Sequence, residues 1–220
     1  MSVPSLPGKI VAVAKNFAAH ALEMGGSAAK PARPTFFIKP ASSVVLAPQP
    51  ILRPARCAEL HHEVELGVVI SRRCSGAAAA DWRSYVAGYR VALDMTARDL
   101  QAQAKAAGQP WTLGKCWDTF TPLGPTIPAE AFARDPHDVE LWLAVDGAQR
   151  QRGSTAGMLF RIPELLQEIS AVMTLEAGDV ILTGTPEGVG PVEPGQTITC
   201  GITGVTEMTF RVEQAPPRRH

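Results

Sequence analysis

Three acidic residues carry the clearest chemical signal in this sequence. Glu63 and Glu65 stand two apart in residues 63–71, a segment that alternates and then becomes fully apolar, as a β-strand does. Residues two apart on a strand point to one face, so both carboxylates are directed at one place. Like charges resist burial together unless a cation lies between them. Asp94, after another β-rich segment, would complete three oxygen ligands for Mg²⁺ or Mn²⁺.

The spacing of the two glutamates has a second interpretation. An ordinary amphipathic strand would also place Glu63 and Glu65 on its solvent-facing side. His61 falls on the same face by alternation, so it is a candidate fourth ligand. It is equally a histidine exposed at a strand edge, because three carboxylates already suit a hard cation. Spacing alone leaves both questions open.

His20 and Glu23 form a second candidate constellation. They stand three apart in residues 17–24, a predicted short helix that ends at Gly25-Gly26. This spacing puts both side chains on one side of the helix, where the carboxylate can orient the imidazole for activation of a water molecule. An ordinary surface pair has the same spacing. The glycines allow the helix to move as a lid, or simply cap it.

Two lysines and a glycine-rich turn add candidate contacts to a substrate. Lys39 and Lys115 each follow apolar residues, where a lysine can hold a carboxylate or enolate oxygen or extend to solvent. Residues 182–190 form a turn after a strand, and their backbone N–H groups could line an anion site. The turn is not a nucleotide-binding loop, because the pattern GxxxxGK[ST] is absent.

The elements that must position these residues are short and rich in β-structure. Glycine and proline, 19 of each, are spread along the chain and punctuate it. A hairpin is predicted over residues 138–152, with Asp146-Gly147 as its turn. Helices are predicted at 17–24, 77–85, 95–107 and 158–172, and further strands at 10–14, 35–38, 44–46, 86–93, 180–183, 197–202 and 206–212.

Length and composition limit the class of protein. The 220 residues fit a single domain, expected over residues 1–214 with a disordered tail at 215–220. A net charge of zero disfavours nucleic acid as a partner. No apolar stretch approaches the roughly 20 residues of a membrane span, and residues 1–9 lack the apolar centre of a secretory signal. Four widely spaced cysteines indicate reduced thiols. We expect a soluble cytoplasmic protein, or a mitochondrial matrix protein if the source is eukaryotic.

The order of these segments resembles the fumarylacetoacetate hydrolase family over roughly residues 10–212. The motifs are KNFAAHALEMG at 15–25, FFIKP at 36–40, HHEVELG at 61–67, LDMTARD at 93–99 and TGTPEGVG at 183–190. The likeness is strongest to the short branch of acylpyruvate hydrolases and oxaloacetate decarboxylases, through LHHE at 60–63 and PWTLGK at 110–115.

The resemblance implies a fold, a partner state and a site. The fold would be α+β and β-rich, a mixed-sheet roll with peripheral helices and a short mobile lid helix, usually as a homodimer. Mg²⁺ or Mn²⁺ would be held by Glu63, Glu65 and Asp94. The catalytic residues would be His20, Glu23 and Lys115. The substrate would be bound by Lys15, Lys39, Arg98, Gln101 and Thr185. One departure is Lys15, where the family usually has arginine, because lysine lacks the planar fork of that residue.

The implied substrate is a small keto acid. The reaction expected first is metal-dependent hydrolysis of an acylpyruvate, such as acetylpyruvate or fumarylpyruvate, to pyruvate and a carboxylic acid. Decarboxylation of oxaloacetate is the alternative, since both reactions pass through pyruvate enolate. A catalytically silent member that only binds metal is the third possibility.

Overall fold

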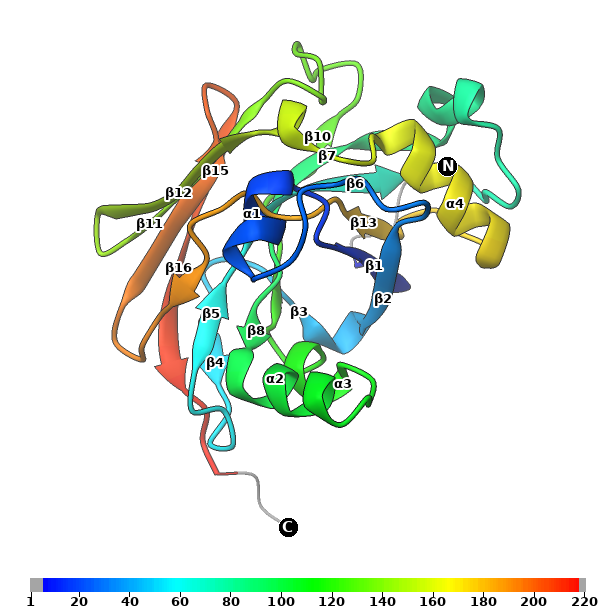
Figure 1. Cartoon of the computed structure of the whole chain (residues 1–220). Helices are drawn as coiled ribbons and strands as arrows, with labels where there is room; N and C mark the ends of the chain where they lie inside the picture. The colour runs from blue at the N-terminus through cyan, green and yellow to red at the C-terminus, as the bar shows by residue number, and fades with distance from the viewer. Residues whose placement is uncertain (1–5, 218–220) are drawn as a thin grey trace.

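The structure is a computed structural model that describes residues 6–217 (Figure 1). Its helices are α1 (Ala18–Glu23), η1 (Ala41–Ser43), η2 (Ala79–Tyr85), α2 (Arg98–Ala106), α3 (Thr112–Lys115), η3 (Thr155–Gly157) and α4 (Ile162–Val172). Its strands are β1 (Lys9–Ala14), β2 (Thr35–Pro40), β3 (Val44–Val45), β4 (Ile51–Arg53), β5 (Leu60–His62), β6 (Val64–Ile70), β7 (Val86–Leu93), β8 (Thr96–Ala97), β9 (Thr121–Pro122), β10 (Ile127–Pro128), β11 (Glu140–Val145), β12 (Ala148–Ser154), β13 (Val180–Leu182), β14 (Gly190–Pro191), β15 (Thr197–Ile202) and β16 (Thr206–Gln214).

The largest sheet among the described residues has six strands in the order β10-β7-β6-β13-β1-β2. Strand β1 is parallel to β13, whereas β6 is antiparallel to both β13 and β7, so the sheet is mixed. Every residue of β6 is buried. Because this strand has no solvent-facing side, the run Val68-Val69-Ile70 is apolar on both faces.

A second sheet, in the order β12-β11-β15-β16-β4, closes the roll on the other side of the core (Figure 1). Leu66 and Val68 of β6 share one hydrophobic cluster with Leu141 and Leu143 of β11. The predicted hairpin is confirmed as β11 and β12. Its turn residues Asp146 and Gly147 have φ of 49° and 79°, the positive values that a two-residue hairpin turn needs.

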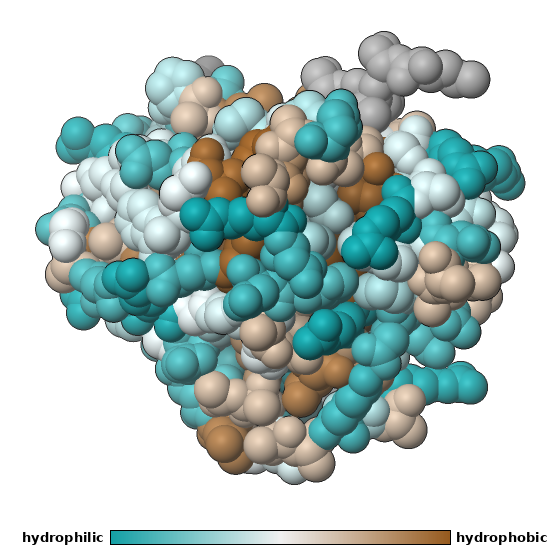
Figure 2. Space-filling model, turned by 90° about the horizontal axis from the view of Figure 1, so that it is seen from above, coloured by the Kyte–Doolittle hydropathy of each residue, from teal (hydrophilic) through white to brown (hydrophobic). Residues whose placement is uncertain are grey.

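The helices lie at the periphery, as the fold class expected. In Figure 1, α2 and α3 lie together beside β8, α4 lies near one edge of the view beyond β6 and β2, and α1 lies in front near the middle. Seen from above (Figure 2), hydrophilic residues cover most of that face, and hydrophobic residues appear between them in separate patches.

Several elements differ from the sequence-based predictions, among them the helix predicted at 158–172, which begins only at Ile162. The helix predicted at 95–107 begins only at Arg98, because Thr96 and Ala97 pair with β5 instead. The helix predicted at 77–85 is a 3₁₀ helix, Ala79–Tyr85, and not an α-helix. The strand predicted at 63–71 begins at Val64, since Glu63 lies in a break between β5 and β6.

The ends of the chain bear on two further expectations. Residues 1–5 and 218–220 lie outside the described residues, so the second half of the tail expected at 215–220 does as well. Ala215 donates its backbone N–H to the carbonyl of Arg53 over 2.9 Å. Within residues 6–217, every helix is too short or too polar to cross a membrane. All four cysteines are unpaired.

Candidate active site

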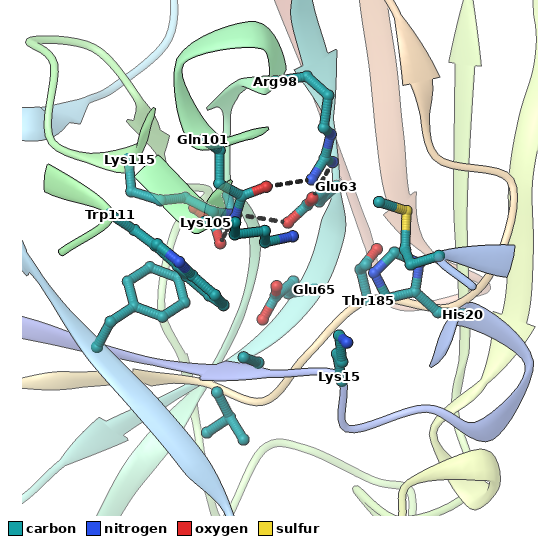
Figure 3. A pocket seen from close by; sticks show the side chains of 15 residues that line it. Lys15, His20, Glu63, Glu65, Arg98, Gln101, Lys105, Trp111, Lys115 and Thr185 are labelled. Atoms are coloured by element: carbon teal, nitrogen blue, oxygen red, sulfur yellow. Dashed lines mark hydrogen bonds and ion pairs between the residues drawn. The ribbon is translucent and has the colours of Figure 1, made fainter. Parts of the chain in front are cut away.

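A pocket that is partly open to solvent brings most of the predicted site residues together (Figure 3). Its walls come from segments far apart in the sequence, which the six-stranded sheet together with α1, α2 and α3 brings to one place. The lining residues are Val13, Ala14, Lys15, His20, Met24, Phe37, Glu63, Glu65, Asp94, Arg98, Gln101, Lys105, Trp111, Lys115 and Thr185.

The three carboxylates meet at the base of this pocket. One oxygen from each of Glu63, Glu65 and Asp94 lies within 4.8 Å of the others. The pairing of β6 with β7 brings them together, because Val64 is opposite Leu93 and the N–H of Asp94 bonds the carbonyl of Glu63 over 2.9 Å. All three side chains are buried, so the solvent-facing interpretation of the two glutamates is wrong. His61 is not part of this group.

Lys115 lies between two of the carboxylates. Its Nζ donates to Glu63 Oε2 over 2.9 Å, to Asp94 Oδ2 over 2.6 Å and to the hydroxyl of Thr96 over 2.7 Å. Burial lowers the pKa of Lys115, but Asp94 and Glu63 outweigh it and raise that pKa overall. Burial likewise opposes ionisation of Glu63, yet Lys115 and Arg98 hold the pKa of this carboxyl below its usual range.

Glu65 is the carboxylate that lacks a cationic partner. Within residues 6–217 it makes no ion pair, and its partner is the N–H of Gly184, 2.5 Å from Oε2. Burial, then Asp94 and Glu63, raise the pKa of Glu65 well above its usual value. Gly184 can donate this bond only as glycine: its φ is 99°, and a Cβ atom there would lie 2.8 Å from the Cβ of Asn16.

The donor set fits a hard divalent cation. Three buried carboxylates offer oxygen ligands only, which is what Mg²⁺ and Mn²⁺ prefer. A buried carboxyl beside two others, without its own counter-ion, favours an additional positive charge at that place. Glu63, Glu65 and Asp94 are therefore the residues that would hold the ion, while Lys115 and Arg98 keep Glu63 ionised.

His20 and Glu23 are held together above the carboxylates by α1. His20 Nδ1 lies 3.1 Å from Glu23 Oε2, and Glu23 Oε1 accepts the N–H of Gly188 over 3.0 Å. A carboxylate only accepts, so Nδ1 carries the hydrogen, and in the neutral imidazole Nε2 then has the free lone pair. His20 is buried and lines the pocket near Thr185 (Figure 3). The pair is thus arranged as a base with its orienting group.

Lys39 is the predicted substrate-binding residue that does not line the pocket. Its side chain is fully buried behind Asp94, with which it forms an ion pair. It also donates to the carbonyls of Phe120, over 2.8 Å, and Met95, over 3.3 Å. Burial lowers its pKa, despite the nearby carboxylate of Asp94. In this position Lys39 supports Asp94 from behind and does not face the pocket.

The other predicted contacts lie on the pocket wall, and two more basic or aromatic residues join them. Arg98 donates to Gln101 Oε1 over 2.7 Å and forms an ion pair with Glu63. Lys105, not singled out from the sequence, lies 5.1 Å above the ring of Trp111. The spacing of positions 98, 101 and 105 on one face of α2 was the signal that could have found it.

Two buried amide side chains behind the pocket wall were also not predicted from the sequence to have a functional role. Asn16 donates to the carbonyls of Phe160 and Thr183, over 2.9 and 2.8 Å, and so fixes the strand end that precedes Gly184. Gln151 joins β12 to β6 and to Thr185. Sequence gave no signal for Gln151, because it lies in a polar hairpin strand beside other polar residues.

Comparisons with known proteins agree on one family. The family model described as fumarylacetoacetate (FAA) hydrolase C-terminal matches residues 9–213. The mitochondrial oxaloacetate tautomerase FAHD2 of Oryza sativa subsp. japonica is 54% identical over 209 residues, 94% of this chain and 91% of that protein. The mitochondrial oxaloacetate decarboxylase of Dictyostelium discoideum is 50% identical over 206 residues, 93% of each chain.

A solved structure extends the likeness to the fold. The fumarylpyruvate hydrolase of Pseudomonas aeruginosa, in complex with Mn²⁺ and pyruvate, superposes with a TM-score of 0.91 at 35% identity, over 98% of this chain and 92% of that one. The expected mixed-sheet roll is confirmed by this match, and the expected resemblance by all three comparisons. The chain belongs to the fumarylacetoacetate hydrolase family.

Proposed function

We propose that this chain is an Mg²⁺- or Mn²⁺-dependent enzyme that acts on oxaloacetate, with interconversion of the keto and enol forms as its main reaction. The observation that carries the proposal is the cluster of three buried carboxylates facing an imidazole whose Nε2 is free. The names of the plant and Dictyostelium relatives support oxaloacetate as the substrate.

Each residue of the site has a separate role in the proposed keto–enol interconversion. A divalent ion held by Glu63, Glu65 and Asp94 would act as a Lewis acid toward the α-keto acid. His20 Nε2 takes a proton from the carbon between the keto group and the far carboxylate, and the proton is returned to the keto oxygen. One C–H bond breaks, one O–H bond forms, and no atom is gained or lost. Lys115 stabilises the negative charge of the enolate.

Basic side chains on the pocket wall favour a substrate with two carboxylates. Lys15, Arg98 and Lys105 all line the pocket around the acidic cluster (Figure 3). An α-keto acid directed at the cluster leaves its far end toward these cations. A carboxylate at that end would form charge-assisted hydrogen bonds with them. Oxaloacetate carries such a carboxylate, and acetylpyruvate does not.

Hydrolysis of acylpyruvates, the reaction expected first from the resemblance, is the second candidate. It is supported by the His20–Glu23 pair, which suits activation of water, and by the likeness to a fumarylpyruvate hydrolase. Water would add to the distal carbonyl, the carbon–carbon bond would break, and pyruvate enolate would take up a proton. Decarboxylation would release carbon dioxide and leave the same enolate.

We further propose a homodimer, on the family resemblance alone. The compartment proposed is the cytoplasm, or the mitochondrial matrix for a eukaryotic source, as the names of the plant relatives support.

A substrate panel tests the proposal. The purified protein is given Mg²⁺ or Mn²⁺ and then oxaloacetate, acetylpyruvate or fumarylpyruvate, while enol absorbance, carbon dioxide and pyruvate are measured separately. We expect enol–keto interconversion to be the fastest reaction and a chelator to abolish it. His20→Gln should slow it about 100-fold or more, since a positioned base contributes roughly that factor, and should slow carbon dioxide release much less.

The matched control is the same metal solution without protein, because free divalent ions also promote these reactions. Faster turnover of an acylpyruvate than of oxaloacetate would move hydrolysis to first place. Rates equal to the metal solution with every substrate would leave only a silent metal-binding member of the family.

A further inference from the structure

The side chain of Gln151 has all of its hydrogen-bonding capacity in use. It is fully buried on β12. Its Nε2 donates to the hydroxyl of Thr185 over 2.8 Å and to the carbonyl of Pro186 over 3.0 Å. Its Oε1 accepts the backbone N–H of Val64 and a hydrogen from His62 Nδ1, each over 3.0 Å. One amide therefore links β12, the start of β6 and the turn that carries Thr185.

Two of these partners fix which way the amide points. The N–H of Val64 can only donate, so the oxygen must face it. The carbonyl of Pro186 can only accept, so the nitrogen must face that side. The orientation of Gln151 follows from backbone groups that have no alternative role, and it cannot be reversed without breaking both bonds.

This orientation determines the polarity of Thr185. Its Oγ already accepts a hydrogen from Gln151, so its own hydrogen is directed elsewhere. Within residues 6–217 no other partner bonds this hydroxyl, and Thr185 lines the pocket beside His20 (Figure 3). The hydroxyl is thereby left with its hydrogen free to donate into the pocket.

The same amide sets the distance between this donor and the acidic cluster. Val64 lies between Glu63 and Glu65, so a bond to its N–H anchors the backbone that carries both carboxylates. His62 bonds the oxygen end of the Gln151 amide through Nδ1, and not the nitrogen end that holds Thr185.

We infer that Gln151 is a positioning residue, which turns the Thr185 hydroxyl into a hydrogen-bond donor for an anionic oxygen of the keto-acid substrate and holds it in register with Glu63 and Glu65. The inference rests on the proposed function, because the donor needs a substrate oxygen in this pocket. Gln151 itself touches no substrate. A keto acid presents carboxylate and enolate oxygens, both of which accept.

A double-mutant cycle between the two residues tests the inference. Gln151→Glu keeps the shape but replaces the donor to Thr185 by an acceptor, and the two N–H donors on its oxygen favour the ionised form. Thr185→Val removes the hydroxyl and keeps the volume, whereas Thr185→Ser retains it. Gln149→Glu, exposed on the same strand, is the matched control. The readouts are kcat/KM for oxaloacetate, Tm, and the Kd of pyruvate by calorimetry with Mg²⁺ present.

Both Gln151→Glu and Thr185→Val should lower kcat/KM and weaken pyruvate binding about ten- to a hundredfold, the worth of one hydrogen bond to a charged group. The double variant should be no worse than the poorer single variant, because both changes remove the same donor. Thr185→Ser should recover most of the loss seen in Thr185→Val, because it retains the hydroxyl, and Gln149→Glu should stay within about threefold of the parent. A residue of purely structural role would instead lower Tm and give losses that multiply.

The inference would be overturned if the losses in kcat/KM of the two single variants multiplied in the double variant, or if Thr185→Val had the kcat/KM of the parent. The proposed function would still stand in either case. If the parent turns over none of the substrates, the proposed function fails, and the pyruvate Kd values decide the inference alone. Unchanged pyruvate binding in both single variants would then refute it.

Discussion

At the scale of single residues, positive and negative charges are unevenly distributed between the base and the rim of the pocket. Lys115 serves both Glu63 and Asp94, and Lys39 supports Asp94 from behind. Glu65 has no cation of its own. A pocket arranged in this way is ready for a divalent ion at its base, because the unshared negative charge lies there. At its rim, Lys105 and Lys15 leave an excess of positive charge.

The excess of positive charge at the rim predicts that Lys105 affects KM differently for different substrates. Lys105→Gln should raise KM for oxaloacetate about three- to tenfold, because an exposed lysine loses a charge-assisted bond to the far carboxylate. For acetylpyruvate, whose far end is an uncharged methyl group, KM should change little. Arg211→Gln, which removes one exposed cation on β16, is the control. Equal increases of KM for both substrates would show that Lys105 does not read the far carboxylate.

At the scale of elements, the pairing of β6 with β7 and the docking of α1 assemble the site. The first places Asp94 beside Glu63 and Glu65. The second depends on Glu23, whose carboxylate joins His20 to the N–H of Gly188. Gly188 has φ of 89°, and a Cβ there would lie 2.2 Å from the carbonyl of Arg150, so the turn can pack on β12 only with glycine at this position.

A buried histidine that bonds the first residue of α4 makes the stability of the fold depend on pH. His137 Nε2 accepts the N–H of Ile162, and Nδ1 lies 3.2 Å from Asp135. Burial lowers the pKa of His137 below the usual 6.5, although Asp135 opposes the shift. As the pH falls, His137 therefore takes up a proton in the unfolded chain before it does so in the folded protein. The stabilisation of the folded state by the neutral His137 ring is complete above pH 6.5 and is lost at lower pH.

The matching experiment compares the parent with His137→Gln by urea unfolding at pH 8 and at pH 5.5. At pH 8 the variant should be about 1 kcal/mol less stable, because a bond at the first turn of α4 is weakened. The difference in free energy of unfolding between the parent and the variant should be smaller at pH 5.5, because only the parent has the histidine with a lowered pKa and loses stability on acidification. A difference that widens on acidification would contradict the direction given for His137.

At the scale of the whole molecule, a metal ion should stabilise the fold, since it would bind only where the three carboxylates are assembled. An ion at 100 times its Kd adds about 2.7 kcal/mol, which is a rise in Tm of roughly 5–10 °C for a domain of this size. Calorimetric scans with Mg²⁺, Mn²⁺ and chelator measure it. Glu65→Gln should remove most of the rise, while Glu213→Gln, exposed on β16, should keep it. An equal rise in both variants would place the ion elsewhere.

The sequence alone indicated the family through its motifs, and the Glu63–Glu65 and His20–Glu23 pairs through spacings that a strand or helix converts into shared direction. Asp94 joins the two glutamates only through the pairing of β6 with β7. The sequence also predicted the hairpin turn at Asp146-Gly147, which depends on local backbone preference. The boundaries at Glu63 and Arg98 were missed, because both follow from the pairing of β5 with β8, a contact between segments more than 30 residues apart.

Only the tertiary structure decided which of the candidate residues face the pocket. It placed Lys39 behind Asp94, brought Lys105 and Trp111 to the wall, and showed Gln151 joining three segments. Side-chain burial and hydrogen-bond partners of this kind depend on how distant strands pack against one another. A local pattern does not contain that information, so polar Gln151 and exposed Gln149 look alike in the sequence although they differ completely in the fold.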